Sequence, residues 1–454
     1  MGNSLEKQAN KLLGILVVTL IFSVMNGTMF NVALPEIRKE FSLLPSEVSW
    51  IMTSYMVVYA IGSVVMGKLA DKYRLKDLLT VGLLVFAAGS LIGFFATDYW
   101  LIILGRIIQA AGASVLPATA MIIPIRYFPP EKRGRALGTS AVGLALGNAL
   151  GPVAAGVLTS VGSWRLMFIL SLLPLVTLPL FRKYLDNSRG QAGKIDFIGG
   201  VLLAGTVTLF LLAITQMNLV LVAIGIALLI LFVVHIRRVD EPFIKPNLFS
   251  NKRYSLGLTL AFLTTAMSFS LTFMTPQFLT DLNKLEPSTI GFLLVPAALA
   301  SAIMGKKGGA IADLKGNMML VFVASILLIS ANFLLSTFVG QSIYIIAMIL
   351  ILANVGQTFM QVSMSNTVSQ SLPKEAIGVG MGLLSMINFI SGAIAMSIVG
   401  KLLDQGTTNL QFNPLNDNQN AFMYSNLLFV MASMILCVLA IYKWQLHTPR
   451  KILG

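Results

Sequence analysis

Charged side chains are scarce in this sequence. Of its 454 residues, 11% are charged and 56% are hydrophobic, whereas a soluble domain carries about 25% charged residues. A chain of this length with so few charges cannot cover a surface that faces water, so the lipid bilayer is the solvent that fits it. The scarcity excludes an ordinary soluble domain and favours a protein that crosses a membrane many times.

Cysteine and histidine are nearly absent as well. The single cysteine, Cys437, excludes an internal disulfide and lies in an apolar run, where we expect it to pack. Two histidines are too few for a typical metal site, so we expect no metal and no cofactor. There is no phosphate-binding loop of the Gly-x4-Gly-Lys-Ser/Thr type and no Ser-His-Asp or His-Glu-x-x-His cluster. These absences argue against ATP hydrolysis and against an enzyme.

Long apolar runs, in contrast, are abundant. A helix of about 20 apolar residues crosses the hydrocarbon core, and backbone groups in lipid must pair within their own segment. We therefore predict an all-α membrane protein with fourteen transmembrane helices and both termini on one side. The predicted spans are 12–34, 49–70, 78–96, 101–122, 136–158, 164–182, 197–215, 219–236, 255–277, 289–305, 318–338, 342–364, 377–402 and 422–443.

The basic residues test that count and set the orientation. If both termini are cytoplasmic, 26 of the 32 lysines and arginines fall in cytoplasmic segments, and Arg106 falls inside a helix. The other five lie outside, namely Arg38, Lys39, Arg165, Lys284 and Lys401. Cytoplasmic loops of membrane proteins are rich in Lys and Arg. The net charge of +14 therefore fits a multi-pass protein of the cell membrane, embedded in lipid, and does not indicate nucleic-acid binding.

Two similar loops indicate two similar halves. The loops at 67–76 and 309–316 follow the second and tenth predicted spans, and in each an aspartate, Asp71 or Asp313, precedes basic residues. Transporters are often built of two such halves with the substrate site between them. We predict an N-terminal six-helix bundle at 1–182, a linker with two inserted helices and a cytoplasmic loop at 183–253, and a C-terminal six-helix bundle at 254–454.

Arg106 is the one basic residue deep in a predicted span, and all 18 acidic residues lie away from span centres. A buried charge is costly and usually faces a cavity or a partner. Gln109 lies three residues on, hence on the same helical face. Arg106 could hold a substrate oxygen or anion, or pin a neighbouring helix during switching. Alternatively, carbonyl groups satisfy it and it only locks helices together.

Amide side chains are the other polar groups at membrane depth. Each alone is more often bonded to a neighbouring helix than to a substrate. Together with Arg106 and the 23 methionines, they indicate a cavity for a mostly neutral, amphipathic small molecule. These amides are Asn26, Asn31, Asn148, Gln357, Gln361 and Asn388.

Small residues line one face of the fifth predicted span. They are Gly143, Gly147, Gly151, Pro152 and Gly156. Small residues at this spacing let helices touch closely. The face therefore either packs tightly or lets the helix slide or rock against its neighbours.

A charge-paired latch is the second candidate device. In the loop that we expect from Tyr127 to Arg135, Arg133 and Arg135 would face Asp71, with Arg74 nearby in the same loop as Asp71. Exposed ion pairs contribute about 0–1 kcal/mol, which is enough to bias a gate. The alternative is a basic loop that only sets the topology.

These segments together resemble a known family. Gly67 to Lys76 resembles the loop signature of the major facilitator superfamily, and Arg106 to Gly112 resembles its helix-4 motif. Gly143 to Gly156 resembles the helix-5 motif of its exporters. Asn26 to Pro35 resembles the helix-1 motif of its fourteen-helix drug:proton antiporter branch. Further similarity to the fourteen-helix tetracycline exporters lies at His235 to Phe243, Asn388-Phe389 and Tyr424 to Asn426.

The sequence also departs from those relatives in its carboxylates. The branch usually carries an acid around Asn26 or Gly27, and the tetracycline exporters carry acids at Asn148 and just after the Asn388-Phe389 match. Those acids are missing here, so the resemblance does not extend to tetracycline–metal transport. It implies a monomeric secondary transporter that exports a hydrophobic drug-like or antibiotic compound, with protons as the coupling ion. An uncoupled facilitator or importer of a small metabolite and a transport-dead membrane sensor remain as alternatives.

Overall fold

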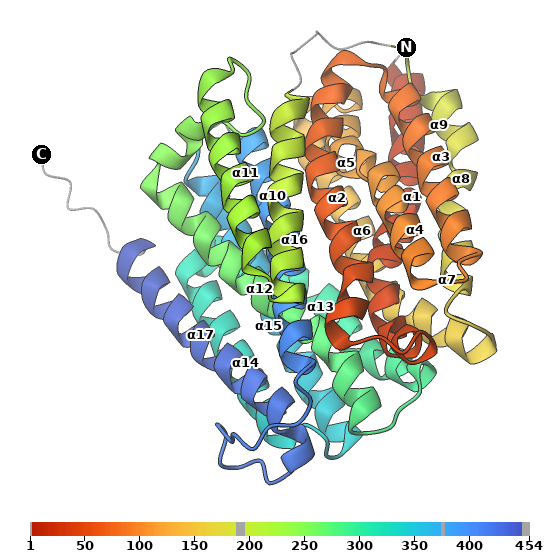
Figure 1. Ribbon diagram of the computed structural model, residues 1–454. Coiled ribbons are helices and arrows are strands. Elements are labelled where there is room, and N and C mark those ends of the chain that lie inside the picture. The colour runs from red at the N-terminus through yellow and green to blue at the C-terminus, as the bar shows by residue number, and fades with distance from the viewer. Residues whose placement is uncertain (1, 188–195, 374–376, 447–454) are drawn as a thin grey trace, which may run out of the picture. The chain divides into compact units, whose positions relative to one another are not determined.

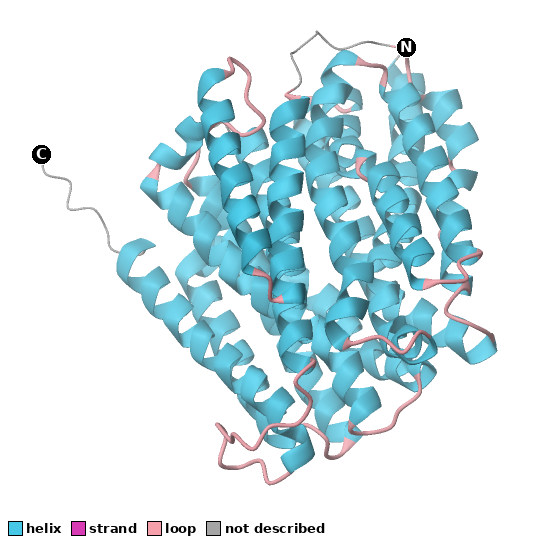
Figure 2. Ribbon diagram, in the orientation of Figure 1, coloured by secondary structure: helices cyan, strands magenta, loops and turns pink. Residues whose placement is uncertain are grey.

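The computed structural model describes residues 2–187, 196–373 and 377–446. Within these residues every regular element is helical, as Figure 2 shows. Fourteen stretches of them are long and apolar enough to cross a membrane. The predicted all-α fold with fourteen spans is therefore confirmed.

The chain divides into two compact units. The N-terminal unit comprises Met1–Lys245 with Pro287–Phe292, and the C-terminal unit comprises Pro246–Glu286 with Leu293–Gly454. The two inserted helices, α10 and α11, thus group with the N-terminal unit. The N-terminal unit contains α1 (Gly2–Glu40), α2 (Pro45–Lys72), α3 (Leu75–Phe94), α4 (Tyr99–Ala113), α5 (Val115–Tyr127), α6 (Pro130–Val161), α7 (Leu166–Leu170), α8 (Leu173–Val176), α9 (Leu178–Tyr184), α10 (Phe197–Gln216) and α11 (Leu219–Arg238).

Two spans of the N-terminal unit are interrupted helices. The fourth span, Tyr99–Tyr127, is made of α4 and α5, which meet at Ser114. The sixth, Leu166–Tyr184, is made of α7, α8 and α9. Prolines stand in the first turns of α8 and α9, where the missing N–H costs no helical hydrogen bond, so each short helix restarts at a proline.

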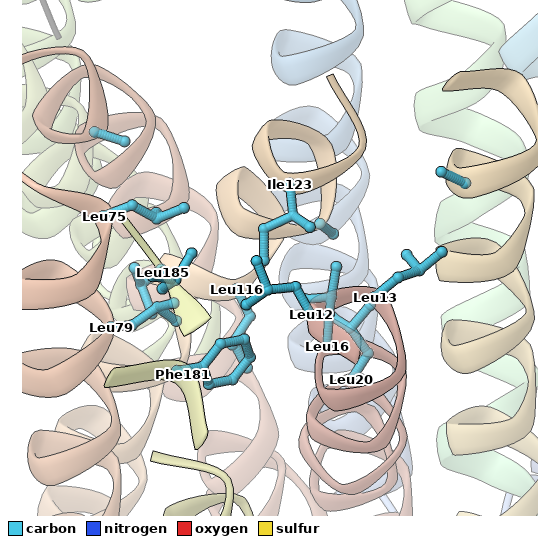
Figure 3. Packing of buried hydrophobic residues seen from close by; sticks show 14 of the residues in the cluster. Leu12, Leu13, Leu16, Leu20, Leu75, Leu79, Leu116, Ile123, Phe181 and Leu185 are labelled. Atoms are coloured by element: carbon cyan, nitrogen blue, oxygen red, sulfur yellow. The ribbon is translucent and has the colours of Figure 1, made fainter. Parts of the chain in front are cut away.

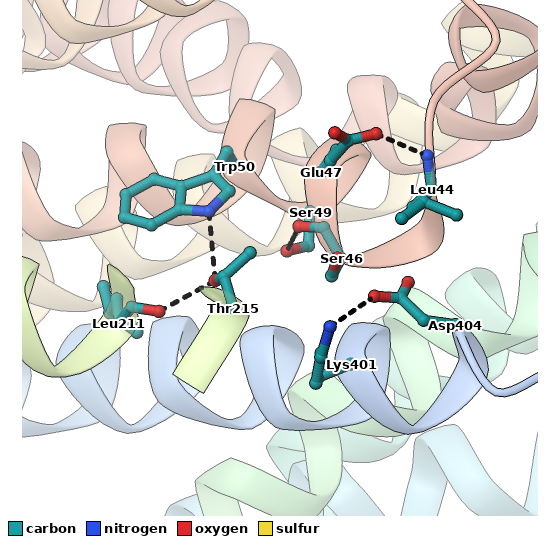
Figure 4. A network of polar contacts seen from close by, with 9 residues as sticks. All are labelled: Leu44, Ser46, Glu47, Ser49, Trp50, Leu211, Thr215, Lys401 and Asp404. Carbon is teal, nitrogen blue, oxygen red and sulfur yellow. Dashed lines mark hydrogen bonds and ion pairs between the residues drawn. The ribbon is translucent and has the colours of Figure 1, made fainter. Parts of the chain in front are cut away.

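A leucine-rich cluster holds the N-terminal unit together. Leu12, Leu16 and Leu20 recur every four residues and therefore share one face of α1. They pack on Leu116 of α5 and belong to the same cluster as Phe181 of α9 (Figure 3). In addition, the indole nitrogen of Trp50 on α2 donates a hydrogen bond of 3.2 Å to Thr215 on α10, which links the inserted pair to α2 (Figure 4).

The C-terminal unit contains the helices labelled in Figure 1 as α12 to α17, except that the beginning of α13, Pro287–Phe292, groups with the N-terminal unit. Their bounds are α12 (Lys252–Asp281), α13 (Pro287–Lys315), α14 (Asn317–Phe338), α15 (Ile343–Gln370), α16 (Ile377–Leu403) and α17 (Phe422–Leu446), with short 3-10 helices at Pro246–Ser250 and Gln419–Ala421. α12 packs on α15, α16 and α17, and α14 packs on α15 and α17. Gly316 joins α13 to α14 at a φ of +83°, which a residue with a side chain rarely adopts.

Cys437 does not pack as expected. It is exposed on α17, whereas Ile435 and Val438 beside it are buried. Residues two apart on a helix point in different directions, so an apolar run does not settle which of its members face inwards.

Candidate functional site

The candidate site lies where α3 packs closely on α4. A side-chain carbon at Gly89 would lie 2.5 Å from the backbone nitrogen of Gln109 and 2.6 Å from the carbonyl oxygen of Gly105. Gly112 likewise abuts the backbone of Phe86. Glycines on both helices thus let the two backbones touch, which brings the polar face of α4 against α3.

Arg106 lies at the centre of this face and is 0% exposed. Its Nη1 donates to Oδ1 of Asn26 at 2.8 Å and to Oε1 of Gln109 at 3.0 Å, and its Nε donates to the carbonyl oxygen of Ile51 at 3.2 Å. None of these partners is a carboxylate.

Two aromatic rings cover the guanidinium group. Its central carbon lies 4.4 Å from the centre of the Phe30 ring and 4.1 Å from that of the Tyr55 ring. Burying a charge costs several kcal/mol. Hydrogen bonds to a charged group contribute about 1.5–3 kcal/mol each, and a desolvated cation–π contact about 2 kcal/mol. The neutral groups around Arg106 can therefore offset the cost of its burial.

The amide partners of Arg106 also donate hydrogen bonds of their own. Nδ2 of Asn26 donates to Oγ of Ser171, which donates to the carbonyl oxygen of Met167 at 2.7 Å. Nε2 of Gln109 donates to Oγ of Ser90 at 2.7 Å. The Arg106 network therefore ties together α1, α2, α3, α4 and the turn between α7 and α8, and its contacts are those of the helix-locking role.

The other predicted amides do not join this network. Asn31 is buried on α1, and its Oδ1 has no partner among the described residues. Asn148 is exposed on α6. In the C-terminal unit, Gln361 is exposed and Gln357 half-buried, while Oδ1 of Asn388 accepts a hydrogen bond of 3.1 Å from Thr265. The structure thus brings together Asn26, Arg106 and Gln109 of the predicted set.

The small residues of the fifth predicted span lie on α6 and face α1. A side-chain carbon at Gly147 would lie 2.7 Å from the carbonyl oxygen of Ile21, and one at Gly143 would lie 3.2 Å from that of Val17. Gly151 abuts the side chain of Thr28. This is the geometry of close packing.

The last two members of that stripe differ. Gly156 meets Ser288 and Gly291, which group with the N-terminal unit. Pro152 lies inside α6 and is half-buried.

The predicted latch lies on helices rather than in loops. Asp71 stands in the last turn of α2, and α6 already begins at Pro130, so Arg133 and Arg135 are helical. The expected loop from Tyr127 to Arg135 is therefore wrong, because Pro130 starts a helix at a position where its missing N–H is harmless.

Most latch side chains lie outside what the structure describes. This holds for the side chains of Asp71, Arg133 and Arg135, and for that of Asp313 in the last turn of α13. Arg74 is the residue before α3 and is half-buried. The pairing of Asp71 with the arginines stays a prediction.

Sequence reasoning missed a second buried charge, Asp196. Its side chain is 3% exposed, and its Oδ1 lies 2.7 Å from Nε2 of His235 on α11. The carboxylate also accepts the backbone N–H groups of Gly199 and Phe243, both at 2.8 Å. Burial raises the pKa of Asp196, but these hydrogen bonds outweigh it and hold the pKa below its ordinary value. An aspartate directly before an apolar span is a typical helix N-cap, which is the signal that could have found it.

Polar side chains also gather around a small cavity of about 10 Å³ in the C-terminal unit. Asn332 is its most buried amide, at 1% exposed. The cavity draws on four helices, α12, α14, α15 and α17. It is lined by Thr264, Met267, Ser268, Leu271, Leu328, Asn332, Gln357, Met431 and Ile435.

A family model described as Major Facilitator Superfamily matches residues 16–396. The chain belongs to this superfamily. It is therefore a secondary transporter of small molecules and not an enzyme. The fourteen spans agree with the fourteen-helix branch that the motifs resemble.

Relatives and solved structures agree with this assignment. The chain is 26% identical over 415 residues to the riboflavin transporter RibZ of Clostridioides difficile (strain 630), covering 88% of this chain and 90% of that protein. It is 28% identical over 420 residues to MdtD of Klebsiella pneumoniae (strain 342), whose assignment to multidrug resistance is provisional, covering 89% and 88%. A bacterial homologue of the human lysosomal transporter Spinster shares the fold, with a TM-score of 0.71, 12% identity and 96% of both chains covered.

Proposed function

We propose that this transporter exports a hydrophobic, mainly neutral drug-like compound across the cytoplasmic membrane in exchange for protons, acting as a monomer with both termini in the cytoplasm. The observation that carries the proposal is the charge of its membrane interior. Arg106 is enclosed by neutral groups, and no acidic residue stands at the centre of a predicted span. Such an interior offers a cationic dye no carboxylate, and it suits neutral amphipathic antibiotics, for example phenicols.

The relatives and motifs support export in particular. MdtD is named for multidrug resistance, and the glycine stripe of α6 resembles the motif of exporters. The excess of basic residues in the segments assigned to the cytoplasm supports the orientation.

Proton coupling requires a group that binds a proton on one side and releases it on the other. Carboxylates at the span ends are the candidates, with Asp71 on the cytoplasmic side. Of those assigned to the outside, Glu47 accepts the backbone N–H of Leu44 at 2.7 Å (Figure 4). Asp281 accepts a hydrogen bond from Tyr424, and Asp404 pairs with Lys401.

Glu36 differs from these three carboxylates. Its Oε2 is buried without a partner among the described residues. We therefore assign the outer proton site to Glu36 and the inner one to Asp71.

A susceptibility panel in an efflux-deficient host tests the export proposal first. Expression of the transporter should raise the tolerated concentration of neutral antibiotics more than that of cationic dyes. Reconstituted protein should then concentrate the same compound under an imposed pH gradient, and Asp71→Asn or Glu36→Gln should abolish the dependence on that gradient. Equilibration of the compound without concentration would show an uncoupled facilitator.

A metabolite carrier is the second candidate. The match to RibZ over most of both chains favours it. Riboflavin counterflow in vesicles, with and without a pH gradient, separates the two functions. Flux of any compound would eliminate the transport-dead sensor.

A further inference from the structure

The cavity around Asn332 leaves a hydrogen-bond acceptor unused. Nδ2 of Asn332 donates to the carbonyl oxygen of Leu328 at 2.8 Å. Because a carbonyl can only accept, this contact fixes which atom of the amide is the nitrogen. The other atom, Oδ1, is buried and has no partner among the described residues. A buried polar atom of this kind costs about 1–3 kcal/mol unless something binds to it.

The hydroxyl groups of the cavity are also acceptors. Ser268 donates its hydrogen to the carbonyl oxygen of Thr264 at 3.0 Å, and Thr264 donates to that of Leu260 at 2.9 Å. With their hydrogens engaged along α12, both oxygens present only lone pairs to the cavity. Gln357 makes no hydrogen bond with a residue that the structure describes and can rotate to suit a guest.

Size and lining define what fits. A volume of about 10 Å³ holds one water-sized group. The rest of the lining is apolar and includes Met267, Leu271, Met431 and Ile435. The cavity therefore has room for one O–H or N–H group and for no larger part of a molecule.

We propose that the Asn332 cavity in the C-terminal unit recognises a hydroxyl or N–H group of the transported molecule, with Oδ1 of Asn332 as its acceptor. This inference rests on the transport function proposed above and names the chemical feature that the substrate must carry. Between transport cycles, water can supply the same donor.

Two pairs of compounds test the proposal on purified protein. Thiamphenicol carries a hydroxyl where florfenicol carries fluorine, and riboflavin carries ribityl hydroxyls that lumiflavin lacks. Binding, measured by equilibrium dialysis, should favour the hydroxyl-bearing member of whichever pair is carried by about tenfold, the effect of one buried hydrogen bond. Asn332→Leu should erase that preference.

The chain offers a matched control. Asn354 on α15 makes the same type of hydrogen bond, from Nδ2 to the carbonyl oxygen of Leu350 at 3.0 Å, but it does not line the cavity. Asn354→Leu should leave the preference intact. Thermal unfolding of both variants checks that each is folded.

The outcomes separate this site from the export proposal. Binding of the riboflavin pair alone, with the hydroxyl preference, would support the site and overturn the export of drugs. Drug efflux without a hydroxyl preference would support export and overturn the site. Failure of wild-type protein to bind either pair, or binding that requires sodium and ignores the hydroxyl, would also overturn the site.

Discussion

Two buried polar sites, one in each unit, differ in how far their side chains are hydrogen-bonded. In the N-terminal unit, Arg106, Asn26 and Gln109 are 0% exposed and bonded to one another and to neighbouring helices. In the C-terminal unit, Asn332 is equally buried, yet its Oδ1 is left without a partner beside a cavity. A saturated network stabilises one arrangement of helices, whereas an unsaturated one has capacity left for a guest. The difference predicts that the Arg106 network anchors helices, and it supports the proposal that the Asn332 cavity recognises the transported molecule.

Of the substitutions that test this comparison, the removal of Arg106 should reduce stability the most. Arg106→Ala strands the amide oxygens of Asn26 and Gln109 and leaves Phe30 and Tyr55 facing a void. We expect a loss of about 1–3 kcal/mol of unfolding free energy for each stranded acceptor and little functional protein, measured by thermal unfolding in detergent. Arg106→Lys keeps the charge but not the planar fork and should fall in between. An Arg106→Ala protein as stable as wild type but inactive would instead make Arg106 a substrate contact.

One substitution made in both units sharpens the comparison. Asn26→Leu leaves Nη1 of Arg106 one acceptor short and should cost about 1–3 kcal/mol. Asn332→Leu removes an unused acceptor and fills space, so unfolding should change by about 0.5 kcal/mol or less, or shift towards greater stability. Melting curves of the two variants, recorded side by side, show which substitution destabilises the protein more. The reverse order would mean that Asn332, and not Asn26, is the anchor.

Overpacking the α1–α6 contact should have an intermediate effect. Gly147→Leu places a side chain against Ile21 and Val24 and should cost about 1–3 kcal/mol and reduce transport. Gly138 on the same helix has nothing within 4 Å of an added side-chain carbon, which makes Gly138→Leu the matched control. Equal melting temperatures and full activity in both variants would remove α1 as the partner of this face.

The effect of replacing Asp196 should depend on pH. Because folding lowers the pKa of Asp196 below its ordinary value of 3.8, its contribution is complete above about pH 4 and is lost as the pH falls through the folded pKa. Asp196→Asn should therefore lower the melting temperature at pH 7 and flatten its fall on acidification. His235→Gln retains a donor for Asp196 and serves as the control. An unchanged acid profile in Asp196→Asn would exclude this carboxylate as a source of the pH dependence.

Hydropathy and charge were sufficient to predict the fourteen membrane spans, because a backbone in lipid has few alternatives to a helix. They also singled out Arg106, since a lone deep charge is conspicuous in any apolar run. The rings of Phe30 and Tyr55 could not be assigned to it, because each comes from another helix whose rotation depends on packing. The role of Asn332 could not be predicted from the sequence for a related reason. Its cavity forms only where four helices meet, and the sequence of no single helix indicates it. The break at Ser114, in contrast, has a local signal, because Pro117 stands three residues later and its missing N–H removes a helical hydrogen bond at this point.

The exposed thiol of Cys437 makes this chain convenient for spectroscopy. Cys437 is the sole cysteine, and it is exposed. Cys437→Ser should therefore yield a thiol-free background without loss of fold. Pairs of spin labels or fluorophores can then be introduced at chosen positions, one on each unit. Distance distributions between them, recorded with and without a pH gradient, would follow the transport cycle directly in a membrane.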